Sequence, residues 1–214
     1  MIKAIIFDMD GVLVDSMKYH IYSWKKSFEN EGLKSDETEL SLFEGMSFKE
    51  TIKRISKHNN KEISVEVQRK IHEDKRKILS EVFKLEIYEE IVEILKFLEE
   101  KGLRLGVVTG SNREFATKII EDNFKEMFEV VVTGDDTKLG KPHPEPYNKA
   151  KEKLGLKSDE ILVVENAPLG ITSAKAAGLK VIAIETTLEK KHLKEANKVL
   201  KDHTELLRYF KDLI

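Results

Sequence analysis

The chain has 214 residues, of which 40% are hydrophobic and 36% charged, which suits one packed domain or a core domain with a smaller insert. Lys and Arg number 37 against 39 for Asp and Glu, and this balance, with a net charge of −2, argues against a nucleic-acid binder. The absence of cysteine excludes disulfides, zinc–thiolate sites and cysteine nucleophiles.

The N-terminal sequence MIKAIIFDMDG predicts a strand rather than a targeting segment. Its apolar stretch is too short for a signal peptide and leads directly into acidic residues. No apolar run in the chain approaches the roughly 18 residues of a membrane span. We therefore expect a soluble, cytoplasmic protein, a monomer or weak oligomer, with neither membrane nor nucleic acid as a partner.

Five short apolar runs predict buried strands. Each is mostly apolar rather than alternating, which is typical of parallel strands that are covered on both faces. The five runs are Lys3–Phe7, Leu103–Val108, Glu129–Thr133, Ile161–Glu165 and Leu179–Ile184.

Helical stretches separate the later strands. Residues Ile87–Glu100 carry apolar side chains at helical spacing. Gly102, Gly155 and Gly178 each precede a leucine, and a glycine at such a place supplies the left-handed C-terminal cap of a helix. The repeated order of helix, glycine and strand predicts an α/β fold with a parallel, Rossmann-like sheet.

The connection after the first strand is far longer than a crossover needs, because no convincing strand occurs between Phe7 and Leu103. Residues 15–83 are charged, free of proline and helix-like. We predict a helical cap domain at 15–83, inserted into an α/β core formed by residues 1–14 and 84–214. One larger α/β domain with extra helices is the alternative.

Asp8 and Asp10 follow the first strand directly, two residues apart. Extended geometry points both side chains to the same side, and Gly11 permits a sharp turn away from the strand. Two carboxylates so close repel each other unless a cation or a shared proton relieves them. The preceding apolar run places the pair at a buried sheet edge, and the segment lacks the further ligands of an EF-hand loop.

Polar groups occur at corresponding places after other strands. Thr109 is followed by Gly110, Ser111 and Asn112, and a hydroxyl beside a helix N-terminus suits an anion, although it is often only a cap. Lys141 precedes a proline-rich loop that holds it stiffly.

Glu165 and Asn166 end another apolar run, where an acidic residue needs a positive partner. Ligands of parallel sheets bind beyond the carboxyl ends of the strands, where the strand order reverses. We therefore expect Asp8, Asp10, Thr109, Lys141, Glu165 and Asn166 to converge. Carboxylates, a lysine and a hydroxyl together match the needs of phosphoryl transfer.

Four motifs in this order resemble those of the haloacid dehalogenase superfamily, in its β-phosphoglucomutase-like group of phosphatases and phosphomutases with a helical cap. The motifs, which with the cap span essentially the whole chain, are DMDGVLVDS, VVTGS, KPHPEPY and VVENAPLGI.

The resemblance implies a role for each core residue. Asp8 would be the nucleophile that forms an aspartyl-phosphate, and Asp10 the general acid and base. Thr109 and Lys141 would bind the phosphoryl oxygens. Mg²⁺ would be held by Asp8, the Asp10 carbonyl, Glu165 and Asn166.

Two positions depart from the family pattern. Asn166 stands where the fourth motif commonly carries a second acid, and its amide oxygen can ligate Mg²⁺ only without charge. In the cap loop that begins at Gly45, Phe48 stands where a phosphomutase would hold its second phosphate with an arginine; Lys49 and Arg113 are candidate replacements.

Further substrate contacts are expected in the cap and after the second strand. His20 and the run Lys75–Lys77 resemble cap residues of the sugar phosphomutases. His20 is either a substrate contact or a packing residue, and Lys77 either a ligand or a solvated surface residue. The full set of expected substrate-binding residues is His20, Gly45, Phe48, Lys77, Ser111 and Asn112.

The leading hypothesis is a Mg²⁺-dependent phosphomonoester hydrolase that acts on a small phosphorylated metabolite through an aspartyl-phosphate. A β-phosphoglucomutase-like sugar phosphomutase is the alternative. A non-catalytic binding protein on the same scaffold is a third reading, which the presence of Asp8, Asp10, Thr109 and Lys141 disfavours.

Overall fold

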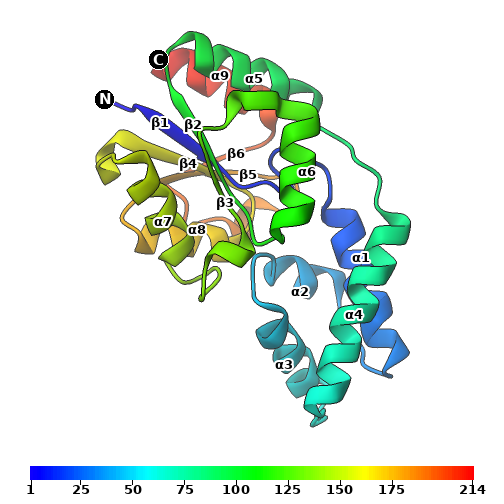
Figure 1. Ribbon diagram of the computed structural model, residues 1–214. Coiled ribbons are helices and arrows are strands. Elements are labelled where there is room, and N and C mark those ends of the chain that lie inside the picture. The colour runs from blue at the N-terminus through cyan, green and yellow to red at the C-terminus, as the bar shows by residue number, and fades with distance from the viewer.

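The computed structural model describes residues 1–214 apart from the side chain of Lys125, and its centre is a six-stranded parallel sheet of order β3-β2-β1-β4-β5-β6 (Figure 1). The strands are β1 (Ala4–Phe7), β2 (Arg104–Val108), β3 (Val130–Val132), β4 (Ile161–Glu165), β5 (Lys180–Ile184) and β6 (Lys198–Leu200). The sheet and the helical segment that follows β1 confirm the predicted α/β fold.

The five predicted strands are confirmed as β1–β5, with ends that differ by at most one residue. The sixth strand, β6, was not predicted. It has only three residues at the sheet edge, begins with an exposed lysine and pairs with β5 alone, so it carries no continuous apolar run.

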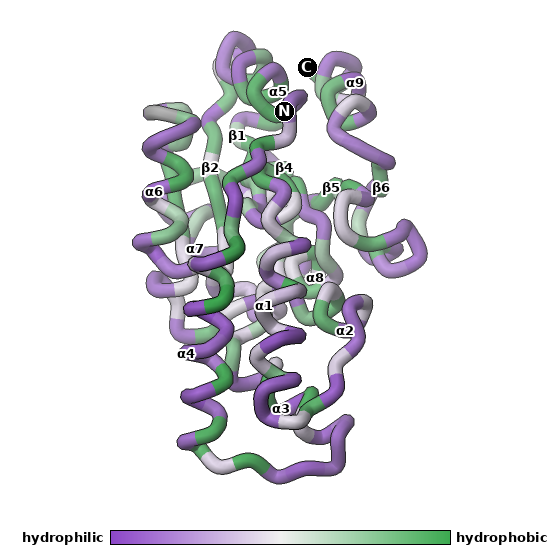
Figure 2. The backbone as a smooth tube through the Cα atoms, turned by 90° about the vertical axis from the view of Figure 1, so that its right-hand side faces the viewer, coloured by the Kyte–Doolittle hydropathy of each residue, from purple (hydrophilic) through white to green (hydrophobic). Residues whose placement is uncertain are grey.

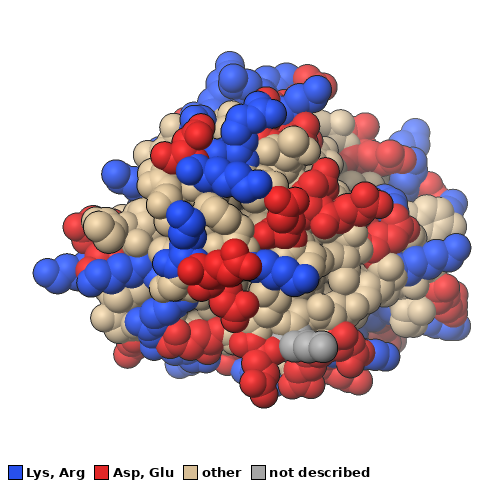
Figure 3. Space-filling view, turned by 90° about the horizontal axis from the view of Figure 1, so that it is seen from above, with Lys and Arg blue, Asp and Glu red and all other residues tan. Residues whose placement is uncertain are grey.

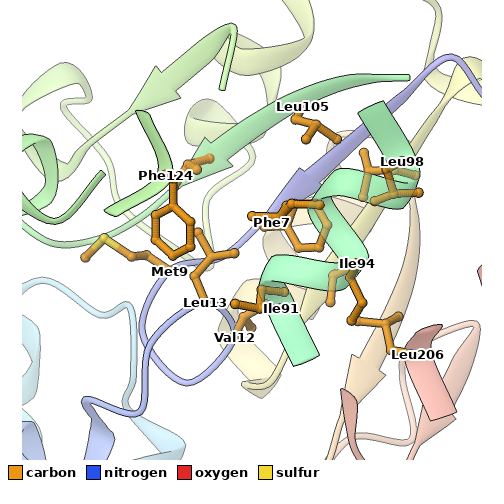
Figure 4. Packing of buried hydrophobic residues seen from close by; sticks show 14 of the residues in the cluster. Phe7, Met9, Val12, Leu13, Ile91, Ile94, Leu98, Leu105, Phe124 and Leu206 are labelled. Carbon is orange, nitrogen blue, oxygen red and sulfur yellow. The ribbon is translucent and has the colours of Figure 1, made fainter. Parts of the chain in front are cut away.

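Helices cover both faces of the sheet (Figure 1). Ile5 and Phe7 of β1 belong to the cluster that packs under α5, α6 and α9, whereas Ala4 and Ile6 pack with α7 and α8. Figure 4 shows Phe7 facing Ile91 and Ile94 of α5. The bounds of these helices are α5 (Glu89–Glu100), α6 (Arg113–Phe124), α7 (Glu145–Leu154), α8 (Pro168–Ala176) and α9 (His203–Leu213).

The helical predictions are confirmed in the same detail. Helix α5 ends at Glu100 as expected and begins two residues later than the apolar pattern indicated. Gly102, Gly155 and Gly178 have φ angles of 74°, 63° and 79°, the left-handed conformation predicted for each.

Four helices lie within residues 15–83, which we call the helical segment, and form a group beside the carboxyl end of the sheet (Figure 1). Ile52, Ile55 and Ile71 are fully buried in its own apolar cluster, and Figure 2 shows hydrophilic stretches along the outside of α3 and α4. Its helices are α1 (Met17–Asn30), α2 (Glu37–Leu42), α3 (Phe48–His58) and α4 (Val65–Val82). The division into domains at 14/15 and 83/84 stays a prediction.

The chain reverses its direction of travel across the sheet between β1 and β4, which are neighbours although β2 and β3 intervene in sequence. Parallel α/β sheets bind ligands beyond the strand ends at such a point. On the face shown in Figure 3, Lys and Arg residues intermingle with Asp and Glu. Among the described residues, no helix is both long and apolar enough to cross a membrane.

Candidate active site

Strand β1 delivers Asp8 and Asp10 to the carboxyl edge of the sheet, where both are almost completely buried. The amide of Asp8 still donates to the Val164 carbonyl at 3.0 Å, so the first carboxylate is fixed by the sheet itself. Gly11 has a φ of 83°, and a Cβ there would lie 2.1 Å from Asn166 Nδ2. The glycine therefore permits both the turn after Asp10 and the close approach of Asn166.

Lys141 joins the first and fourth strand ends. Its Nζ donates to Asp8 Oδ1 at 2.6 Å and to Glu165 Oε1 at 2.5 Å, and the lysine is only 5% exposed. Burial opposes the charge on Lys141, but the two carboxylates outweigh it and hold its pKa well above the usual value. Burial raises the pKa of Asp8 to about 8, with Lys141 opposing the rise and Glu165 adding to it.

The carboxylate of Glu165 is saturated with protein donors. Oε1 accepts from Lys141 and, at 2.7 Å, from the hydroxyl of Tyr147, which is fully buried. Oε2 accepts from the amides of Asn166 and Ala167. A Cβ at Gly170 would lie 1.8 Å from Oε1, so the helix that follows β4 needs a glycine at this position to admit the carboxylate.

Asp10 is surrounded by hydroxyl donors. Ser16 Oγ donates to Oδ1 at 2.6 Å, while Ser111 Oγ and Thr109 Oγ1 donate to Oδ2 at 2.9 and 3.2 Å. Burial opposes ionisation of Asp10, but His20 and these hydrogen bonds outweigh it and hold the pKa well below its usual range. The site thus keeps the second carboxylate ionised without a buried cation in contact with it.

His20 of α1 reaches Asp10 from the helical segment, with Nε2 3.3 Å from Oδ1. Lys75 of α4 lies behind it, its Nζ 3.2 Å from His20 Nδ1 and 5.6 Å from the centre of the Trp24 ring. Burial and the neighbouring Lys75 lower the pKa of His20, and burial lowers the pKa of Lys75 to about 8. Burial and Lys75 thus oppose the positive charge that His20 would place beside Asp10.

Glu44 is a site residue that the sequence did not reveal. It lies between α2 and α3, and its Oε2 accepts from Asn166 Nδ2 at 3.2 Å. Burial and the carboxylates of Asp8 and Glu165 raise the pKa of Glu44 well above its usual value. Asn166 Nδ2 also donates to Thr187 Oγ1 at 2.9 Å. The only signal near Glu44 in the sequence is the glycine that follows it.

Gly45 lets the loop of Glu44 reach the sheet edge, where it lies against Gly110 and Gly140. Gly45 has a φ of 78°, and a Cβ there would lie 2.9 Å from Lys141 Cδ. A Cβ on Gly110 or on Gly140 would meet the Gly45 backbone at 3.5 Å. The loop between α2 and α3 therefore packs directly on the residues that hold the carboxylates.

A cavity of about 1130 Å³ lies between the helical segment and the sheet edge, and most of the predicted site residues line it. Asp8, Asp10, Thr109, Lys141 and Glu165 reach it from the sheet, and His20, Gly45 and Phe48 reach it from the helical segment. Phe48 stacks on the His72 ring, with centroids 3.9 Å apart.

Other predicted contacts have different surroundings. Ser111 lines the cavity but donates to Asp10, and Asn112, also on the cavity wall, accepts from the Phe115 amide at the start of α6. Lys77 is exposed and lies outside the cavity lining, which includes Lys75 instead.

The donor atoms at this edge suit a hard cation such as Mg²⁺. Asn166 is fully buried, and its Oδ1 lacks a hydrogen-bond partner among the described residues, as does Glu44 Oε1. Carboxylate and amide oxygens are ligands that Mg²⁺ accepts. In the described part of the chain, no three Asp, Glu or His side chains form a ready-made metal cage. A cation here would therefore rely partly on neutral oxygens.

Comparisons with known proteins agree with this geometry. Residues 5–184 match the family model described as haloacid dehalogenase-like hydrolase. The chain is 30% identical over 211 residues to the validoxylamine A 7'-phosphate phosphatase of Streptomyces hygroscopicus subsp. limoneus, with 96% of each chain covered. It is 29% identical over 217 residues to the phosphorylated carbohydrates phosphatase of Thermotoga maritima, with 99% of this chain and 100% of that protein covered.

Solved structures show the same likeness. A structure from Bacteroides vulgatus, provisionally assigned as a beta-phosphoglucomutase, has a TM-score of 0.90 and 34% identity, covering 98% of this chain and 88% of that one. The beta-phosphoglucomutase of Clostridium difficile has a TM-score of 0.85 at 24% identity, covers 99% of this chain and 96% of that one, and shows the fold alone. The chain belongs to the haloacid dehalogenase-like hydrolases, and is a phosphatase of the group whose structures resemble beta-phosphoglucomutase.

Proposed function

We propose that the protein is a Mg²⁺-dependent phosphomonoester hydrolase that acts on a small phosphorylated metabolite through an aspartyl-phosphate on Asp8. One observation carries the proposal. A buried lysine, Lys141, holds Asp8 in the same cavity as Asp10, a second carboxylate in a hydroxyl-lined pocket. A nucleophile beside a cation and a separate proton-transfer group are what phosphoryl transfer through a carboxylate needs.

The reaction would use the two carboxylates in turn. An Asp8 oxygen attacks phosphorus, the bond to the ester oxygen breaks, and protonated Asp10 gives its proton to the leaving alcohol. Asp10, now ionised, accepts a proton from water as the water oxygen attacks phosphorus and the bond to Asp8 breaks. Lys141 and Thr109 neutralise and orient the phosphoryl oxygens. The products are the alcohol and inorganic phosphate.

The first step needs Asp8 ionised and Asp10 protonated, whereas the pKa shifts in the structure run the other way. A divalent cation beside Asp8 would favour its ionised form and would reduce the repulsion among the carboxylates. The phosphate of a bound substrate adds negative charge beside Asp10, and a nearby anion raises the pKa of a carboxyl group. Substrate and cation together would thus move both groups toward the required states.

Mg²⁺ would be held by Asp8, the Asp10 carbonyl, Asn166 and Glu165, and it supplies positive charge for the phosphoryl oxygens when bound. Glu165 already accepts hydrogen bonds on both oxygens, so it would have to exchange a donor to ligate directly. Asn166 Oδ1 is free of such a partner among the described residues.

Phosphate release from p-nitrophenyl phosphate tests the proposal. Wild-type protein should release phosphate with Mg²⁺ and lose that activity in EDTA. Asp8→Asn should abolish turnover while the fold is kept, because the amide is nearly isosteric. Asp159→Asn, which changes an exposed carboxylate outside the cavity lining, is the matched control. Release by Asp8→Asn at the wild-type rate would exclude the covalent mechanism.

The substrate is proposed from the relatives and the cavity. The relatives from Streptomyces and Thermotoga are named for validoxylamine A 7'-phosphate and for phosphorylated carbohydrates. A cavity of about 1130 Å³ has room for such a molecule. A panel of sugar phosphates and other phosphometabolites, assayed for released phosphate, is the direct measurement.

A sugar phosphomutase is the second candidate, favoured by the likeness to the Bacteroides vulgatus structure. A mutase must hold a distal phosphate, which a bidentate arginine does best. Arg113 pairs with Asp136 instead, and Phe48 stacks on His72, but Arg76 lines the cavity.

Incubation with β-glucose 1-phosphate, Mg²⁺ and a catalytic amount of the bisphosphate separates the two candidates. We expect net hydrolysis, with phosphate as the main product. Stoichiometric glucose 6-phosphate with little free phosphate would establish the mutase. Phe48→Arg should increase affinity for sugar bisphosphates by supplying the bidentate group.

A further inference from the structure

Residues 165 and 166 at this sheet edge offer little negative charge to a cation. Glu165 accepts from Lys141 and Tyr147 on Oε1 and from two backbone amides on Oε2. Its negative charge is therefore largely taken up by protein donors, and Asn166, the next residue, is neutral. Residues 165 and 166 together offer a cation little of the charge that two free acids would supply.

At this sheet edge, two buried oxygens lack a hydrogen-bond partner among the described residues, and they belong to side chains in contact. One is Oδ1 of Asn166, which is fully buried, and the other is Oε1 of Glu44. The two side chains meet through the other half of each group, because Asn166 Nδ2 donates to Glu44 Oε2 at 3.2 Å. This contact fixes the amide so that its oxygen, and not its nitrogen, is left for a ligand.

Leaving buried polar oxygens without partners costs free energy, roughly 1–3 kcal/mol each in proteins. Asn166 Oδ1 is an acceptor, and Glu44 Oε1 is one whenever its carboxyl is ionised, so a cation suits both atoms. Asp8 and Glu165, which are buried, and the half-buried Glu44 also outnumber Lys141, the one buried lysine of the described residues. A divalent cation would be coordinated by the unpaired oxygens and would compensate the excess negative charge of the carboxylates.

Glu44 comes from the helical segment rather than from the sheet. Its loop lies against the sheet edge because Gly45 approaches Lys141 and the backbone near Gly110 and Gly140. A group that reaches a cation from this loop would tie the helical segment to the core.

We propose that Glu44 belongs to the divalent-cation site and supplies the negative charge that Asn166 lacks, so that cation binding holds the loop between α2 and α3 against the sheet. This inference rests on the cation dependence in the proposed function. Asn166 contributes its amide oxygen, and Glu44 both orients that amide and adds a carboxylate. The cation site is thereby completed only when the helical segment is closed over the sheet edge.

Binding of Mg²⁺ and of Mn²⁺, measured by titration calorimetry without substrate, tests the charge. Glu44→Gln keeps the shape of the side chain and should weaken the cation about tenfold or more, because changes beside metal ligands typically cost 10–100-fold in affinity. Glu62→Gln removes an exposed carboxylate from the same helical segment and should bind as wild type does. Moving the charge in Glu44→Gln/Asn166→Asp should restore most of the lost affinity.

Hydrogen exchange of the wild-type protein provides a second readout that needs no variant. Amides of residues 43–46 should exchange at least about threefold more slowly when Mg²⁺ is added, because the cation stabilises the docked loop. The same experiment on Glu44→Gln should show no such protection at a Mg²⁺ concentration that saturates the wild type.

Each result has one meaning. Unchanged affinity in Glu44→Gln, a double variant as weak as the single one, or loop exchange that ignores Mg²⁺ would overturn the inference and leave the proposed hydrolase intact. A wild-type protein that binds neither cation and releases no phosphate would overturn the proposed function instead. Weakening in Glu44→Gln with recovery in the double variant supports the inference.

Discussion

Removing the hydroxyl of Tyr147 tests whether Glu165 is held as the structure indicates. The hydroxyl donates to Glu165 Oε1 at 2.7 Å, and the residue is fully buried. Tyr147→Phe deletes this hydrogen bond and keeps the ring, over which Lys141 Nζ lies at 5.4 Å from the centroid. The variant therefore changes one donor and leaves the apolar packing of α7 in place.

The magnitude follows from the charge of the acceptor. Hydrogen bonds to charged groups contribute about 1.5–3 kcal/mol, and breaking one leaves a buried carboxylate with fewer donors. Lys141 and two backbone amides remain on Glu165, which limits the loss. We expect a decrease of about 2 kcal/mol in the free energy of unfolding, or roughly 4–8 °C in melting temperature for a chain of this size.

Urea unfolding followed by circular dichroism, with EDTA present so that no cation contributes, measures this difference. Tyr22→Phe is the matched control, because Tyr22 is 46% exposed and its change should stay within about 0.5 kcal/mol. A Tyr147→Phe protein as stable as the wild type would refute the argument. It would mean that Glu165 finds another donor or moves when the hydroxyl is absent.

Two further changes act on the same carboxylates. The pKa of Asp8 is raised from 3.8 to about 8, so the folded state binds more protons between these values and the carboxyl weakens the fold as pH rises. Asp8→Asn should therefore be more stable than the cation-free wild type, by a few kcal/mol near pH 8 and by little near pH 4. Urea unfolding at both pH values measures this gain in the free energy of unfolding, and an equal gain at the two pH values would show that Asp8 titrates normally. In Gly170→Ala, the new Cβ would lie 1.8 Å from Glu165 Oε1, so the usual helical gain of about 1 kcal/mol should become a loss of about 2 kcal/mol. Thermal unfolding measures this loss, and a more stable variant would show that Glu165 has room to move.

The sheet and its edge could be predicted because their signals are local. Strands β1 to β5 are mostly apolar runs. Asp8 and Thr109 directly follow β1 and β2, Glu165 ends β4, and Lys141 lies on the loop between β3 and α7. Asp8, Thr109, Lys141 and Glu165 then meet because parallel strands end at one edge. The edge strand β6 has no such local signal, since a strand of three residues that pairs with one neighbour needs little apolar surface.

Glu44 and Tyr147 could not be predicted in the same way. Each lies in a stretch whose pattern describes its own element, and the contact with Glu165 or Asn166 depends on how that element packs on the sheet. A tyrosine among apolar helix positions reads as core, and a glutamate between two charged helices reads as surface. The partner lies 18 residues away for Tyr147 and 122 away for Glu44, so no local pattern contains the pair.

Which of Lys75 and Lys77 faces the cavity can be predicted from the sequence, because the spacing of the apolar residues in helix α4 shows which side of the helix is buried. Successive residues of an α-helix are about 100° apart, so these two lysines point about 200° apart and only one can face the cavity. Ile71 is fully buried in the cluster of the helical segment, and Lys75, four residues later, lies on the same side of the helix. A lysine one turn after a buried isoleucine faces the same side as that isoleucine. In the structure, Lys75 contacts His20, whereas Lys77 is exposed. The apolar phase of a helix therefore identifies which of its charged residues enters a site, even where the motif that contains them does not.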